Sequence, residues 1–144
     1  MREINKIIVH CSGTPEFKEF DVNDIRTWHV DGNWWSDVGY HYIVKLDGVI
    51  ENGRPESKIG AHVKGNNRDS IGLCYIGGMN KDMTKWLDTR NEPQKESLIK
   101  LLGELKCKYP DSIVYGHKDF TKKKLCPSFD AKKEYQYISN EKKV

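Results

Sequence analysis

The sequence predicts a single α/β domain over residues 1–144, in which helices flank a central mixed β-sheet. A chain of 144 residues is long enough to bury one core but short for two. Short β-branched apolar segments alternate with segments whose apolar residues recur at helical spacing. Hydrophobic residues make up 37% and charged residues 31% of the chain, which excludes a membrane protein and a disordered chain.

The first part of the chain predicts a strand followed by a helix. Residues 7–9 are consecutive β-branched apolar residues, which indicate a buried strand that delivers His10 to its end. A helix of about ten residues begins after Asp21, because apolar residues recur at helical spacing from Val22 and the Asp21 side chain can cap the first turn. Gly32 ends this helix.

The middle of the chain predicts a β-hairpin and a central strand. Side chains over residues 39–46 alternate with a period of two, and Asp47-Gly48 is a characteristic hairpin turn before residues 49–51. Residues 70–76 are almost continuously apolar, as expected of a strand that is covered on both faces.

The remaining segments predict a helix, a strand and a final short helix. Residues 91–108 begin with an Asn cap and a Pro in the first turn and then place leucines on one helical face. Residues 112–115 form a further strand, which delivers His117 to its end much as the first strand delivers His10. Residues 130–137 predict the last helix, and a polar tail follows from about residue 138.

The charge of the chain is mildly basic and unevenly distributed. The net charge of +3 is too small for a dedicated nucleic-acid binder, and the sequence predicts neither a nucleic-acid partner nor membrane insertion. Residues 117–134 alone carry a net charge of +3, because this segment contains six lysines and three acidic residues. These lysines are Lys118, Lys122, Lys123, Lys124, Lys132 and Lys133. A basic rim beside a site would suit a polyanionic partner.

The four cysteines are widely separated and form no CxxC pair, which favours a reducing compartment. Cys11, Cys74 and Cys107 are interpreted as small core or helix-face residues. The N-terminus lacks an apolar signal region, so synthesis in the cytoplasm is expected. A substrate outside the membrane would therefore require release of the protein by another factor.

Two strands that end in histidine suggest a metal site. The ends of strands at one edge of a sheet converge in space, so His10 and His117 could share an ion if Cys126 folds back beside them. Two imidazoles and one thiolate would leave the fourth position of a tetrahedral zinc ion open, as catalysis requires. Spacing alone leaves open the alternative that each histidine is only hydrogen-bonded.

Two other histidines in the first half of the chain, His29 and His41, are not predicted to be metal ligands. His29 lies inside the predicted helix and is interpreted as structural. Tyr40 and His41 are neighbours on a strand, so their side chains point to opposite faces and at most one of them can readily face a metal.

Four segments, in order along nearly the whole chain, carry a resemblance. They are Ile8-Val-His-Cys-Ser12, Asp37-Val-Gly-Tyr-His-Tyr-Ile43, Gly60-Ala-His-Val-Lys-Gly-Asn66 and Lys124-Leu-Cys-Pro-Ser-Phe-Asp130. Together they resemble the type 2 N-acetylmuramoyl-L-alanine amidases, most closely the coliphage lysozyme-type members, whose fold is shared with peptidoglycan recognition proteins.

This resemblance implies a zinc enzyme that cleaves the amide bond between N-acetylmuramic acid and L-alanine in peptidoglycan. It places one zinc ion in a groove on one face of a mixed sheet. The implied positions are the zinc ligands His10, His117 and Cys126, the catalytic Tyr40 and Lys124, and the substrate-groove residue His62. Recognition proteins that bind without cutting typically lack the cysteine ligand.

The match departs from the family before the cysteine. The segment between His117 and Cys126 is one residue longer than in the phage enzyme and contains three consecutive lysines, so Lys122 and Lys123 compete with Lys124 for the catalytic position. Some relatives use a carboxylate as the third ligand. Because the cysteine occupies that position here, Asp119 and Asp130 are interpreted as structural, and Asp130 as a helix N-cap.

Three alternative functions remain open at this stage. The chain could be a binding module without activity, an inhibitor of RNA polymerase, since a phage relative also binds that enzyme, or a zinc amidohydrolase for small amides. A monomer is expected. A phage, a prophage or a host recycling pathway would each be a suitable source, and the enzyme would act on the cell wall after release or on cytosolic muropeptides.

Overall fold

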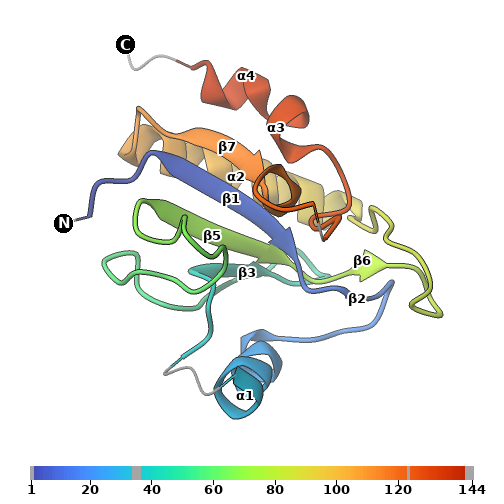
Figure 1. The fold of residues 1–144 in the computed structure, drawn as a ribbon. Helices are drawn as coiled ribbons and strands as arrows, with labels where there is room; N and C mark the ends of the chain where they lie inside the picture. The colour runs from blue at the N-terminus through green and yellow to red at the C-terminus, as the bar shows by residue number, and fades with distance from the viewer. Residues whose placement is uncertain (1, 34–36, 123, 142–144) are drawn as a thin grey trace.

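A five-stranded sheet forms the centre of the fold (Figure 1). Its strand order is β4-β3-β5-β1-β7, and β4 pairs antiparallel with β3 while the other pairs are parallel. The strands are β1 (Lys6–Cys11), β3 (Tyr42–Val44), β4 (Ile50–Asn52), β5 (Ser70–Tyr75) and β7 (Ile113–Gly116). The computed structural model describes residues 2–33, 37–122 and 124–141 and confirms a single α/β domain with a mixed sheet.

Strand β1 lies between β5 and β7 and runs parallel to both. Its register aligns Val9 with Gly116 of β7 and His10 with Cys74 of β5. The C-terminal ends of the three strands therefore meet at one edge of the sheet. Such an edge is where open α/β sheets bind ligands, and it brings the residue after β7, His117, beside His10.

One face of the sheet is closed by an apolar core under three helices, which are α2 (Glu92–Lys108), α3 (Ala131–Glu134) and α4 (Gln136–Ser139). Helix α2 begins as predicted, since Asn91 and Gln94 form a reciprocal capping box. The single helix predicted over residues 130–137 is instead the two short helices α3 and α4. Ile138 of α4 is buried and belongs to the core.

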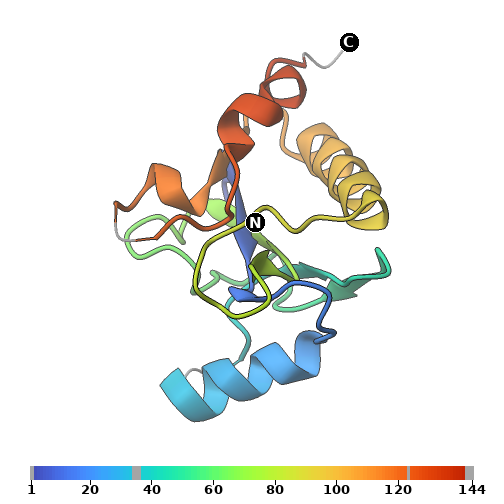
Figure 2. The ribbon, with the colours of Figure 1, turned by 90° about the vertical axis from the view of Figure 1, so that its right-hand side faces the viewer.

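The opposite face is covered by one helix, α1 (Val22–Asn33), and Figure 2 shows α1 and α2 on opposite sides of the sheet. Val22 and Ile25 of α1 belong to a second, smaller apolar cluster. Asp21 caps α1 as predicted, because its side chain accepts a hydrogen bond from the Asp24 N–H. Helix α1 continues past Gly32, where the sequence placed its end, by one residue.

Two features were not predicted. A second sheet pairs β2 (Thr14–Pro15) with β6 (Gly78–Met79), and a 3-10 turn, η1 (His117–Asp119), follows β7. The predicted hairpin is present, but β3 is much shorter than residues 39–46. Within the described ranges, none of the helices has the length and apolar character needed to cross a membrane.

Candidate metal centre

Three side chains from different parts of the chain converge where β1 and β7 end. Potential ligand atoms of His10, His117 and Cys126 all lie within 4.8 Å of one another. The Nδ1 atom of His10 lies 3.9 Å from the Cys126 sulfur, and the two imidazole centroids are 4.7 Å apart. The predicted convergence of these three residues is therefore confirmed as geometry, and the cluster is a candidate metal site.

The chemistry of this donor set fits a cation of zinc type. Burial lowers the pKa of His10 and His117, so both imidazoles are neutral and keep a lone pair for a metal. Burial also raises the pKa of the Cys126 thiol, so a thiolate at this position needs a cation beside it. The Cys11 backbone N–H donates to the same sulfur at 3.1 Å and fixes its position.

Cys126 does not lie in a strand, and other contacts hold its segment. The Tyr75 hydroxyl donates to the Pro127 carbonyl at 2.6 Å, and the Ser128 hydroxyl donates to the Gly78 carbonyl at 2.8 Å. Gly116 permits the close approach, since a Cβ there would lie 2.8 Å from Pro127 Cδ. The cysteine segment thus packs directly on the end of β7.

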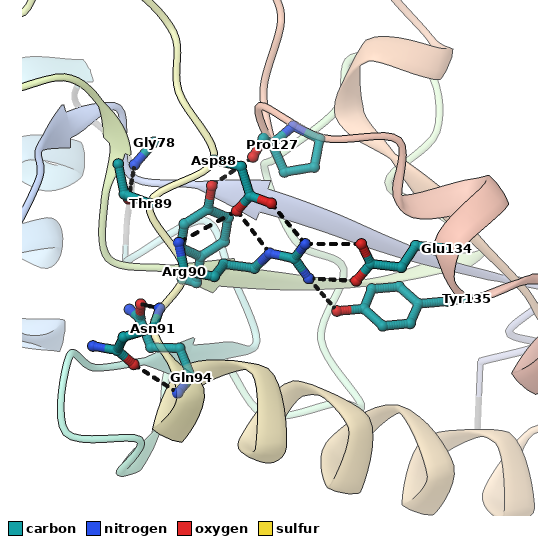
Figure 3. A network of polar contacts seen from close by, with 10 residues as sticks. Gly78, Asp88, Thr89, Arg90, Asn91, Gln94, Pro127, Glu134 and Tyr135 are labelled. Carbon is teal, nitrogen blue, oxygen red and sulfur yellow. Dashed lines mark hydrogen bonds and ion pairs between the residues drawn. The ribbon is translucent and has the colours of Figure 1, made fainter.

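An ion-pair network around the buried Arg90 side chain, shown in Figure 3, anchors the chain that follows Cys126. The Arg90 guanidinium is 2% exposed and forms ion pairs with Asp88 at 2.8 Å and with Glu134 at 2.6 Å. It also donates to the Tyr135 hydroxyl, and its Cζ lies 3.3 Å from the Phe129 ring centroid. Sequence reasoning missed this network, because a lone arginine before a helix cap carries no local signal.

A cavity of about 230 Å3 opens beside the cluster. Tyr40, His62, Trp86, His117 and Lys124 are among the side chains that line it. A second hollow of about 470 Å3 shares three of them, His62, His117 and Lys124. The cluster is therefore accessible from a groove formed by these two neighbouring hollows.

Tyr40 lines the cavity, whereas His41 points elsewhere. The Tyr40 ring centroid is 5.0 Å from that of His10, and burial raises the pKa of its phenol, so the hydroxyl remains protonated at neutral pH. His41 is fully buried, with Nε2 at 2.8 Å from the Lys58 carbonyl and Nδ1 accepting from the Gly72 N–H. This agrees with the predicted alternation of the two side chains.

The lysines of the basic stretch do not form one rim. Lys124 borders both cavities of the groove. Lys132 and Lys133 line a separate hollow beside α3 and α4, so the predicted rim next to the site is partly wrong. Lys122 is exposed and is not among the lining residues of either groove cavity, and Lys123 lies outside the described residues.

The remaining assignments agree with the sequence interpretation. Asp119 accepts from the Gly116 N–H and Asp130 caps α3, as expected of structural residues. His29 accepts from the Gly39 N–H and also lines the smaller cavity. The structural assignment of three cysteines holds, because Cys11 and Cys74 are buried and Cys107 lies exposed on α2.

His62 contacts His10 directly, at 2.9 Å between ring nitrogens, which sequence reasoning did not anticipate.

Comparison with known proteins identifies what this chain is similar to. A family model described as N-acetylmuramoyl-L-alanine amidase matches residues 1–129. The endolysin of Enterobacteria phage T3 is 43% identical over 130 residues, which cover 90% of this chain and 84% of that protein. The amidase LysC of Clostridium intestinale superposes with a TM-score of 0.77 at 27% identity, covering 95% of this chain and 83% of that one. Bumblebee PGRP-SA gives the same TM-score at 26% identity, covering 94% and 82%.

Proposed function

We propose a zinc-dependent mechanism from the premise that this chain belongs to the N-acetylmuramoyl-L-alanine amidase family. The protein is an N-acetylmuramoyl-L-alanine amidase, and it hydrolyses the amide bond between N-acetylmuramic acid and L-alanine. The observation that carries the proposal is the buried His10, His117 and Cys126 cluster at the base of an open groove. Three protein ligands with an accessible fourth side are typical of catalytic zinc rather than structural zinc.

The three ligands would hold one zinc ion. Two neutral imidazoles and one thiolate match the preferences of zinc, and the widely separated cysteines offer no CxxC-type structural site. When bound, zinc supplies Lewis-acid chemistry, which polarises the scissile carbonyl and makes water nucleophilic near neutral pH. The same cysteine argues against a recognition module that binds without cutting.

The surrounding side chains would stabilise and orient the reacting amide. The Tyr40 hydroxyl is protonated and therefore acts as a hydrogen-bond donor toward the oxygen on which negative charge develops. The Lys124 ammonium, at the groove mouth, would stabilise the same charge. His62 forms part of the groove wall, where its ring edge would contact the substrate.

The substrate and place of action follow from the family and its relatives. The curated relatives from phages T3 and T7 carry the name endolysin, and we infer that this enzyme likewise degrades bacterial peptidoglycan, after release to the cell wall. Lys64 and Lys124 both line the larger part of the groove. Their positive charges would favour the anionic groups of the wall polymer.

Peptidoglycan digestion and metal analysis test this function together. Wild type should contain about one zinc per chain and should release stem peptides that begin with L-alanine while glycan strands stay intact, as mass spectrometry would detect. Cys126→Ser should lose both zinc and release. Cys107→Ser, at an exposed cysteine on α2, is the matched control and should retain both. Release of reducing sugars, or full activity in zinc-free protein, would contradict the proposal.

A further inference from the structure

The second ring nitrogen of His10 is engaged inside the protein. While His10 Nδ1 faces the Cys126 sulfur, His10 Nε2 lies 2.9 Å from His62 Nδ1. The other nitrogen of His62, Nε2, lies 3.2 Å from the Ser70 hydroxyl oxygen. That hydroxyl in turn lies 2.6 Å from the Asn66 carbonyl oxygen. Four residues therefore form one continuous hydrogen-bonded chain that starts at the metal cluster.

The direction of every bond in this chain is determined by its last member. A carbonyl oxygen can only accept, so Ser70 donates its single hydrogen to Asn66. The Ser70 oxygen must then accept from His62, which places the hydrogen of His62 on Nε2 and leaves Nδ1 as an acceptor. His10 must therefore donate from Nε2, and its Nδ1 lone pair points at the cluster.

Both rings are neutral, as this assignment requires. Both imidazoles are buried, and within the described residues neither is hydrogen-bonded to a carboxylate that would favour a charged ring. A neutral imidazole carries one N–H, so fixing the hydrogen on one nitrogen exposes the lone pair of the other. A metal ligand needs that lone pair.

We infer that His62 is a positioning residue, which together with Ser70 holds His10 in the tautomer and ring orientation that present Nδ1 to the metal. Metal-bound histidines commonly donate their second N–H to a carboxylate or a carbonyl; here the acceptor is another histidine. This inference rests on the proposed zinc function and adds a role for His62 beyond the groove wall.

The surroundings of His62 are built to hold its ring in place. Asn67 accepts hydrogen bonds from the backbone N–H groups of both His62 and Val63, at 2.9 and 2.8 Å. Gly72 of β5 leaves the space for the ring, since a Cβ there would lie 2.7 Å from His62 Cγ. His62 is only 9% exposed. Because both ring nitrogens are satisfied within the protein, neither is free to hydrogen-bond substrate.

Zinc affinity and histidine tautomers test this inference without any peptidoglycan. His62→Leu should raise the zinc Kd about 10- to 100-fold, the range found when a partner of a metal ligand is removed. Long-range 1H–15N spectra of the zinc-free protein should show the hydrogen of His10 on Nε2 in wild type and a mixture of tautomers in His62→Leu.

Two further variants separate positioning from folding. His62→Asn keeps an acceptor near the Nδ1 position and should bring the zinc Kd back to within about threefold of wild type. Lys106→Met, which removes a buried polar side chain that donates to the Ser112 carbonyl, should lower the thermal midpoint yet preserve the His10 tautomer.

An unchanged zinc Kd and an unchanged His10 tautomer in folded His62→Leu would overturn the inference. Failure of the wild type to bind zinc at all would instead overturn the proposed function.

Discussion

The candidate metal ligands are of two kinds, which are held by different physical means. His10 lies within β1, and His117 follows β7 directly, so a ladder of backbone hydrogen bonds with Val9 opposite Gly116 fixes their separation. Cys126 lies outside any strand. A single backbone hydrogen bond, from the Lys118 N–H to the Cys126 carbonyl at 2.7 Å, and several side chains hold its segment. Tyr75 anchors this segment from within the core.

The difference shows where the site depends on individual residues. A strand ladder is formed by backbone groups that every sequence supplies, so single substitutions rarely shift it. Side-chain anchors are lost when one residue changes. The backbone positions of the strand-borne histidines should therefore tolerate most changes around them, although the ring of His10 also depends on His62. The position of the cysteine should instead be sensitive to substitutions in the residues that anchor its segment.

The largest effect is expected at Lys124, the loop residue that borders both cavities of the groove. Lys124→Ala should lower kcat about 10²- to 10³-fold, the usual result of removing one stabiliser of an oxyanion, while zinc content and thermal midpoint stay unchanged because Lys124 is exposed. Turnover of soluble muropeptide would measure kcat.

Lys122→Ala is the matched control for this prediction. Lys122 is an exposed lysine of the same loop that is not among the lining residues of the groove cavities, and its removal should change kcat by less than about threefold. Equal losses in both variants would assign the effect to the general charge of the loop rather than to Lys124.

A smaller but more revealing effect is expected at Arg90, which lies under the cysteine segment. Arg90→Met should lower the free energy of unfolding by about 1–3 kcal/mol, because charge-assisted hydrogen bonds from the buried Arg90 side chain to the partly exposed Asp88 and Glu134 are lost. The zinc Kd should also rise about tenfold, since Phe129 loses its packing partner three residues after Cys126. Urea denaturation of zinc-free protein and competition with a chelator measure the two quantities.

Lys106→Met provides a control with comparable burial. Lys106 is 5% exposed and donates to the Ser112 carbonyl at the opposite end of α2, away from the cysteine segment. Its loss should lower stability without changing the zinc Kd. If Arg90→Met behaves in the same way, the network of Figure 3 stabilises the fold but does not position the cysteine.

The same contrast explains how much of the fold the sequence could predict. Strand β5 and helix α2 carry their signals locally, in an apolar run and in a cap followed by spaced leucines. The second sheet could not be predicted, because β2 and β6 are two residues each and have no pattern. The split between α3 and α4 depends on the tertiary packing of Tyr135 and Ile138.

The site shows a similar division. Two strands that end in histidine suggested His10 and His117 from the sequence pattern alone. Cys126 entered the set only on the condition that it folds back, and the family resemblance supplied the stronger support. Nothing local in the sequence indicates that Cys126 meets His10 across 116 residues. The contact between His10 and His62 spans 52 residues and was likewise beyond any local pattern.

Tyr40 precedes β3, and both backbone and side-chain contacts hold its segment. The Tyr40 carbonyl accepts from the Arg54 N–H at 2.9 Å. The neighbouring Gly39 N–H donates to Nδ1 of His29 on α1 at 2.8 Å. Burial, with a smaller contribution from Arg54, lowers the pKa of His29 to about 4. Protonation would remove the acceptor, so this contact is available only to the neutral ring.

The smallest expected effect is therefore a pH dependence of stability. Between pH 6.5 and 4 the unfolded chain binds a proton at His29 and the folded chain does not, so the free energy of unfolding should fall as the pH falls through this window. His29→Asn keeps an acceptor for Gly39 but no longer titrates. Urea denaturation of both zinc-free proteins isolates this residue, since other histidines contribute equally to each, and the variant curve should be flatter. Parallel curves would mean that His29 is protonated alike in both states, and that Tyr40 is held by other contacts.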